Sequence, residues 1–409
     1  MSQGPRRRRN PWGIALAVTA TAVVTGLGYY WWACSEFKPS SKDSSGEDEG
    51  IDDHECTNYT NGHHTGDDRE ARHCRPCDRE TQRQLDINAH VNAHYQSIQK
   101  IARDTTVTTL LSPLSHNIKS MDDMDEIIAR LQNEKGSLTT AEKLHLWESV
   151  LDRVLCRFIC VVWLVPMLQL MVRVQLNVMG RSLYLQTSLS GNNDVERLHP
   201  RLSNVPNSNS SFSNPSRLSN NAQETFLRLS EHVVCRGCYI LRDMASGIAL
   251  EYSRELLGRL GSVGATVRDS EMAEAIGDAL AAFERERLEA DGWVAWETAI
   301  MPSENEFRGM LDVAVMDGNE RGEVDGMWRE TVRVYQSNAF RTMYLAGCAR
   351  ALAAGMLRGI GGDGEPLVRV LPRVARVIDQ ATRDAAFSHG LMGERLEELS
   401  ASVYAGANF

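Results

Sequence analysis

Cysteine residues at metal-ligand spacing are the first candidates for chemistry in this sequence. Cys74-Arg-Pro-Cys77 has the spacing of a zinc knuckle, and Cys235-Arg-Gly-Cys238 is a second pair of the same form. Zinc needs four ligands in a tetrahedron, which two such pairs could supply in principle. The second pair falls in a helical pattern, however, where a three-residue spacing is ordinary. Chance composition is therefore the favoured interpretation, and we predict no metal and no cofactor.

Catalytic groups are the next candidates, and none of them forms a recognisable set. His90 and His94 share one helical face, but no Glu follows the first His as it does in zinc proteases. The chain has no nucleophile-elbow segment and no P-loop segment. The paired acids Asp122 and Asp123 have the pattern of a solvated helix face. We therefore predict that the chain is not an enzyme and has no catalytic residues.

One aromatic residue could serve binding. Trp147 lies in the segment Lys143-Leu-His-Leu-Trp147-Glu148, close to the expected start of a long helix. Grooves that receive a partner helix use such an aromatic anchor, with neighbouring leucines as walls. A large aromatic in this position can equally be a core residue. From the residues alone the core interpretation is favoured.

The composition describes an ordinary, mildly acidic globular chain. Its 409 residues are 42% hydrophobic and 24% charged, and the formal net charge is −10 at pH 7. A nucleic-acid surface over the whole chain would be basic, so we expect no nucleic-acid partner. Nine cysteines are too few for a disulfide scaffold. Length alone suggests about two to three domains.

Helical periodicity from residue 87 onward predicts an all-α fold. Thr139-x-x-Glu142 is a capping box that should open a long helix from Ala141 to about Tyr184, with Pro166 kinking or dividing it. Apolar stripes at three- and four-residue spacing indicate further helices at 110–131, 224–260, 270–289, 310–316, 332–357 and 367–404. Because no long stretch alternates like a strand, we predict one elongated bundle of long helices at 87–409.

Two hydrophobic stretches could cross a membrane. Residues 158–172 lie between Arg157 and Arg173 and are only 15 in number, which is below the spanning length. We therefore expect them to form a buried central helix. Residues 11–32 contain no charged side chain and are 22 in number, which is long enough to span.

The second of these stretches has the flanks of a transmembrane anchor. Aromatic residues stand at both of its ends, as at membrane interfaces: Trp12, Tyr29, Tyr30, Trp31 and Trp32. The basic tail 1–10, with Arg6, Arg7, Arg8 and Arg9, precedes it. A cleaved signal peptide is the alternative, but the stretch is long for one and ends in bulky residues. The positive-inside rule alone would keep the four arginines in the cytosol.

Two polar segments complete the organisation. Residues 33–86 have few large apolar side chains and are expected to form a flexible tether. Residues 190–221 are rich in Ser, Asn and Pro and are expected to form a mobile loop. Part of the chain length is therefore assigned to linkers, and one helical domain accounts for the rest.

Three segments resemble the peroxin-3 family (peroxisomal biogenesis factor 3). The stretch 172–185, VRVQLNVMGRSLYL, resembles the family signature R-x-Q-L-N-x-x-G-x-x-x-Y-L, and it follows the Trp147 segment on the same predicted helix. His94-Tyr-Gln-Ser-Ile-Gln99 resembles the H-F-x-S-x-Q segment of the family. Ile300-Met-Pro-Ser-Glu304 resembles its later M-x-P-x-E loop. The His- and Cys-bearing tether, the Asn/Ser-rich insertion and the C-terminal half depart from the family pattern.

The resemblance implies a function and a binding site. Family members are membrane-anchored docking factors for peroxisomal membrane protein import, and a groove at the end of their helical body receives an amphipathic N-terminal helix of peroxin-19. Peroxisomal membrane proteins are then indirect cargo. The groove residues of the family correspond here to Trp147, Lys143, Leu144 and Leu131.

The resemblance also implies a location. It places the chain in the peroxisomal membrane as a single-pass protein, with insertion by way of the endoplasmic reticulum as one route. The short N-terminus then lies in the matrix, with Arg6–Arg9 as targeting signal, and the body lies in the cytosol. We prefer this topology to that of the positive-inside rule. The alternative function is a membrane-anchored tether that recruits organelle-inheritance or pexophagy partners.

Overall fold

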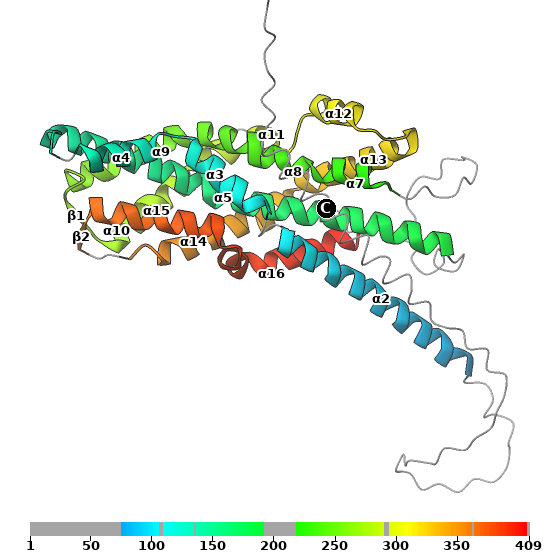
Figure 1. The fold of residues 1–409 in the computed structure, drawn as a ribbon. Coiled ribbons are helices and arrows are strands. Elements are labelled where there is room, and N and C mark those ends of the chain that lie inside the picture. Colours follow the sequence, from blue (N-terminus) through cyan, green and yellow to red (C-terminus); the bar gives the residue numbers. More distant parts are fainter. Residues whose placement is uncertain are drawn as a thin grey trace, which may run out of the picture.

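One helix, α5 (Thr140–Gly191), runs through the middle of the molecule, and the other helices surround it (Figure 1). The computed structural model describes residues 75–105, 109–134, 136–191, 218–289, 294–361 and 364–406. The basic tail, the predicted anchor at 11–32 and most of the predicted tether and loop lie outside these residues.

Within the described residues the fold is an all-α bundle, as predicted. Short π-helical turns interrupt several helices, and one two-stranded antiparallel ribbon joins β1 to β2, with Thr266 opposite Pro366 and Val267 opposite Glu365. The remaining elements are α2 (Arg75–Thr105), α3 (Leu111–Ser120), α4 (Met124–Asn133), α7 (Asn220–Leu227), α8 (Leu229–His232), η2 (Val233–Gly237), α9 (Cys238–Leu260), β1 (Thr266–Val267), α10 (Asp269–Phe283), η3 (Glu284–Glu289), α11 (Val294–Ile300), α12 (Glu304–Val313), α13 (Gly318–Gln336), η4 (Phe340–Leu345), α14 (Ala346–Arg358), β2 (Glu365–Pro366), α15 (Leu367–Arg383) and α16 (Ala385–Tyr404).

The burial of α5 explains its sequence. Residues 157–180 are buried without exception, including the positions that would face solvent on an ordinary surface helix. A helix covered on all sides is apolar all round, whereas a surface helix has a polar face. In the described part of the chain α5 is the helix long and apolar enough to cross a membrane, and its apolar window is wholly buried within the bundle. The stretch 158–172 is therefore the core helix that we predicted.

The start of α5 is the predicted capping box. The backbone N–H and the hydroxyl of Thr139 both donate to the Glu142 carboxylate at 2.8 Å, and the Glu142 N–H donates to Thr139 Oγ1 at 3.2 Å. These bonds satisfy N–H groups that the first turn of a helix leaves without partners. Pro166 lies inside α5 and does not divide it, because the tightly packed surroundings hold the helix together through the missing hydrogen bond.

Several predicted boundaries are wrong. α2 begins at Arg75, inside the predicted tether 33–86, since Arg, Glu and Gln are good helix formers even without an apolar stripe. The predicted helix at 332–357 is two helices, α13 and α14, joined at Ser337 and η4. The predicted loop 190–221 overlaps the last residues of α5 and the first of α7.

Candidate docking surface

Trp147 lies near the start of α5 and is half-buried, with its ring packed on the edge of the core. It differs in this from Trp163 and Trp296, whose exposed fractions are 2% and 1% and whose rings meet edge to face at 5.4 Å in the core. Leu144 and Lys143, one turn earlier, are also half-buried. A tryptophan that is partly accessible and partly packed has the burial expected of a binding anchor.

Helix α4 supplies the neighbouring wall. Ile127, Ile128 and Leu131 on α4 are half-buried and pack against the same core, and α4 packs against α5. Figure 1 shows α4 and the start of α5 together at one end of the bundle. The predicted residues Leu131, Lys143, Leu144 and Trp147 are therefore brought to the same end by two adjacent helices.

Two ion pairs fix α4 against α5. Arg157 is buried, donates to Asp122 at 2.6 and 2.9 Å and to the Lys119 carbonyl at 2.8 Å, and Arg153 donates to Asp123 at 2.9 Å. The hydrogen bond from Arg153 lowers the pKa of Asp123. Our interpretation of these two acids as a solvated helix face is therefore wrong for Asp122, whose side chain is largely buried, whereas Asp123 is exposed; both lie in the turn before α4. They hold the turn between α3 and α4 on the flank of α5.

Helix α9 also packs against α5 near this end. Cys156 approaches the Arg242 carbonyl at 4.0 Å, and Ser253 is hydrogen-bonded to Asp152, so α5 and α9 run antiparallel. Residues of α5 that precede Asp152 consequently lie beside the C-terminal end of α9. That end carries the half-buried Leu257 and Leu260. This end of the bundle thus carries half-buried leucine and isoleucine side chains, one tryptophan and one lysine.

A buried hydrogen-bond cluster joins two of the segments that resemble the family, 94–99 and 172–185. Arg173 on α5 is 3% exposed and donates to Gln99 on α2 at 2.7 Å, and Gln99 donates to Asn177 at 3.1 Å. Arg173 also contacts His389 at 3.0 Å and Ser400 at 3.4 Å on α16. Burial lowers the pKa of Arg173 to about 10. This buried polar cluster of α2, α5 and α16 fastens α2, the first described helix, to the core.

Gly180 and Tyr184 continue the same contact. A Cβ at Gly180 would come within 2.2 Å of Ile98 Cδ1, so the glycine permits α2 and α5 to approach closely. Tyr184 packs on the rings of His90 and His94, and His94 is hydrogen-bonded to Tyr404 at 2.8 Å. The signature 172–185 is thus a packing motif. Sequence reasoning recognised it by resemblance and did not predict its contacts.

His94 should make the stability of the fold depend on pH. Burial, assisted by the charge of His90, lowers the pKa of His94 from 6.5 to about 4. The unfolded chain therefore binds the proton more readily than the folded one between about pH 6.5 and 4, and stability should fall as the pH is lowered through that window. The loss attributable to His94 is at most about 3 kcal/mol.

The measurement is urea unfolding of the native chain and of the H94N variant at pH 7 and at pH 4.5. The variant cannot titrate, so its stability should change less between the two conditions. Equal pH dependence of both chains would contradict the assignment.

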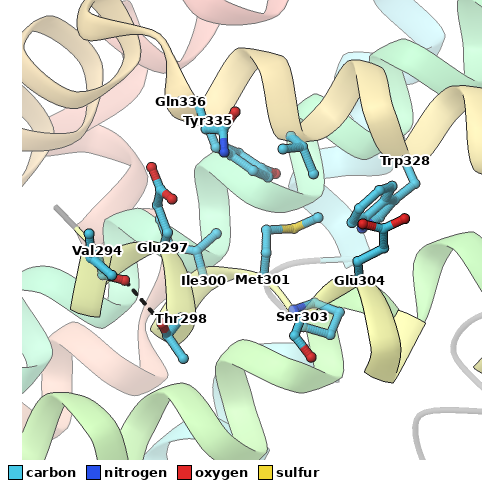
Figure 2. Close-up of a pocket in the computed structure, with 12 residues that line it drawn as sticks. Val294, Glu297, Thr298, Ile300, Met301, Ser303, Glu304, Trp328, Tyr335 and Gln336 are labelled. Carbon is cyan, nitrogen blue, oxygen red and sulfur yellow. Dashed lines mark hydrogen bonds between the residues drawn. The ribbon is translucent and has the colours of Figure 1, made fainter. Parts of the chain in front are cut away.

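The third segment lines a cavity at the side of the bundle. Met301 and Pro302 lie between α11 and α12, and Trp328 and Tyr335 of α13 close the cavity, whose volume is about 280 Å³ (Figure 2). Ser303 caps α12 in a capping box with Glu306. Trp328 stacks on Phe307 with ring centroids 4.6 Å apart.

The candidate metal ligands are not brought together where the structure describes them. His90 and His94 pack on Tyr184, and Cys238 is buried while Cys235 is exposed. In the described ranges no cluster of three or more His, Cys, Asp or Glu residues is arranged to hold a metal. The run 359–364 has the spacing G-x-G-x-x-G, but it follows helix α14, whereas a dinucleotide fingerprint follows a strand and opens a helix.

The geometry defines the class of protein: an elongated all-α bundle around one buried central helix, with a half-buried aromatic surface at one end. The family profile of Peroxin-3 matches residues 69–354. The chain therefore belongs to the peroxin-3 family.

Two plant proteins are similar to part of the chain. Peroxisome biogenesis protein 3-2 of Arabidopsis thaliana is 37% identical over 102 residues, which are 25% of this chain and 28% of that protein. Peroxisome biogenesis protein 3-1 of the same organism is 36% identical over 102 residues, with the same coverage. The chain thus matches little more than a quarter of the length of these relatives.

Proposed function

We propose that this chain acts in peroxisome biogenesis as a membrane-anchored docking factor for peroxin-19, and so enables insertion of peroxisomal membrane proteins. Family membership and the printed names of the two relatives support the biogenesis role. The half-buried Trp147 at the end of the bundle carries the docking part of the proposal. The half-buried apolar residues of α4, of the start of α5 and of the C-terminal end of α9 would bind the apolar face of a partner helix, and Lys143 would pair with an acid at its edge.

The same proposal places each segment of the chain relative to the membrane. Residues 11–32 anchor the chain in the peroxisomal membrane, 33–74 connect the anchor to α2, and the helical body faces the cytosol. The short N-terminus with Arg6–Arg9 lies in the matrix and carries the targeting information. The Asn/Ser-rich segment between α5 and α7 is given no role in docking.

The test expresses the chain with a C-terminal tag in cells that lack their own copy of a peroxin-3. We expect the tag on peroxisomal membranes, its removal by protease without detergent, and co-purification of peroxin-19. A tag protected from protease would contradict the topology. Correct location without co-purified peroxin-19 would contradict the docking role and favour a tether for other partners.

A further inference from the structure

Helix α15 carries a row of arginines that the proposed docking function does not use. Its buried face contains Leu367, Val370, Leu371, Val374, Val377, Ile378 and Ala381, and its outer face carries Arg369, Arg373, Arg376 and Arg383. At about 100° per residue the four arginines fall within an arc of about 80°, and along the axis they extend over about 21 Å. We call these four residues the α15 arginine row.

Most of this positive charge is free to meet a partner. Arg373 is paired with Glu365 at 2.5 Å and also lies near Asp269, and Asp379 is paired with Lys119 of α3 at 2.9 Å. Asp384, just past the helix, accepts the Phe387 N–H as the N-cap of α16. Among the residues that the structure describes, Arg369, Arg376 and Arg383 have no acidic side chain within ion-pair distance, although Arg369 lies close enough to Glu365 to help lower the pKa of that carboxyl. The nearby acids are therefore already engaged, in a chain whose formal charge is −10.

The shape of this surface favours a flat partner. Arg369, Arg376 and Arg383 are exposed on the outside of α15, and the residues that line the cavities of about 280 and 520 Å³ belong to other elements, α11–α13 and α7 with α12. A row of exposed guanidinium groups can meet the phosphates of a bilayer together, whereas a peptide is held better in a groove.

The position of the α15 arginine row in the bundle also favours a membrane surface as its partner. Figure 1 shows α14, α15, α16 and α2 along one long side of the bundle, and α2 leaves the bundle from that side. In the sequence, α2 follows the predicted anchor and most of the predicted tether. A tether of limited length keeps the body close to the membrane, so a weak electrostatic contact is enough to orient it.

We propose that the α15 arginine row binds the anionic lipid headgroups of the membrane in which the chain is anchored, and so lays the body of the bundle along the membrane surface. The proposal rests on the anchoring part of the proposed function and is independent of peroxin-19. Phosphate and carboxylate headgroups are the ligands, and guanidinium groups bind them in forked hydrogen bonds.

The test uses the full chain embedded in lipid nanodiscs of phosphatidylcholine alone or with about one third phosphatidylserine, each with a trace of photo-crosslinking lipid. We expect crosslinks within residues 367–383 in the anionic discs. The R369Q/R376Q/R383Q variant should reduce them by about tenfold or more. Salt at about 0.5 M, roughly three times physiological ionic strength, should do the same because it screens the attraction between surface charges.

The matched control is R308Q/R329Q/R333Q, which removes the same charge from exposed positions on α12 and α13 and should leave the crosslinks unchanged. Equal crosslinking in neutral and anionic discs, or none in either, would overturn the proposal. Binding of a polyglutamate peptide by the row without lipid contact would also overturn it in favour of an acidic protein partner.

Failure of the chain to enter the discs would contradict the predicted transmembrane anchor at 11–32. The α15 arginine row could then be tested without the anchor. The free chain can be floated with vesicles of the same anionic composition. Loss of flotation in the triple variant alone would then support the proposal, and equal flotation of native chain and variant would overturn it.

Discussion

Replacing Trp147 with alanine should weaken the binding of peroxin-19 by about 30-fold or more, while the chain stays folded. A tryptophan at the centre of an interface commonly contributes about 2 kcal/mol or more to binding, and each 1.4 kcal/mol is about tenfold in Kd. Trp147 is only half-buried in the free chain, so its removal costs the fold less than the removal of Trp163 or Trp296 would. Isothermal calorimetry with peroxin-19 measures the change.

Trp328 provides the matched control. It is also a half-buried tryptophan, but it lies on α13 beside the cavity of Figure 2, away from α4. The W328A variant should bind peroxin-19 as the native chain does. Native affinity of a folded W147A variant would contradict the assignment of the docking surface. A W147A variant that loses its helical circular dichroism would instead support the core interpretation of this residue.

Replacing Arg173 with alanine should destabilise the chain by about 3 kcal/mol or more. The change leaves Gln99 Oε1 without its donor in a buried site and opens space where α2, α5 and α16 meet. Since Gln99 holds α2 through this cluster, amide exchange should accelerate in α2 before it does in α9. Urea unfolding and hydrogen exchange of the full chain provide the two measurements.

Arg153 on the same helix is the control for this change. Its ion pair with Asp123 is at the surface, where such pairs contribute about 1 kcal/mol or less. R153A should therefore unfold close to the native midpoint. Equal stability losses in R153A and R173A would show that the buried cluster has no special role in holding α2.

The sequence predicted the large features of the fold because local patterns determine them. The capping box at Thr139 predicts the start of α5, and the apolar stretch 158–172 predicts its burial. The residues Leu131, Lys143, Leu144 and Trp147 came from resemblance, since a half-buried tryptophan and a core tryptophan have the same local pattern. Only the surrounding helices decide between these two.

Contacts between distant segments were not predictable in this way. Gln99 and Arg173 are far apart in the sequence, and their hydrogen bond depends on the packing of three helices. The ion pair of Asp122 with Arg157 was missed for the same reason, because acids in a row on a helix are usually solvated. The α15 arginine row could have been found from its spacing alone, since the arginines alternate with valine and leucine at helical intervals.

The central helix also has a mechanical consequence. Trp147 and the end of α5 at Gly191 are separated by about 65 Å along a helix, at about 1.5 Å per residue. α2 runs beside the far end of α5 and leaves the bundle there, opposite α4 (Figure 1). The proposed docking surface at the start of α5 and the point where α2 leaves the bundle therefore lie at opposite ends of the central helix, so a rotation of the body about its N-terminal attachment would move that surface through the longest arc the molecule allows.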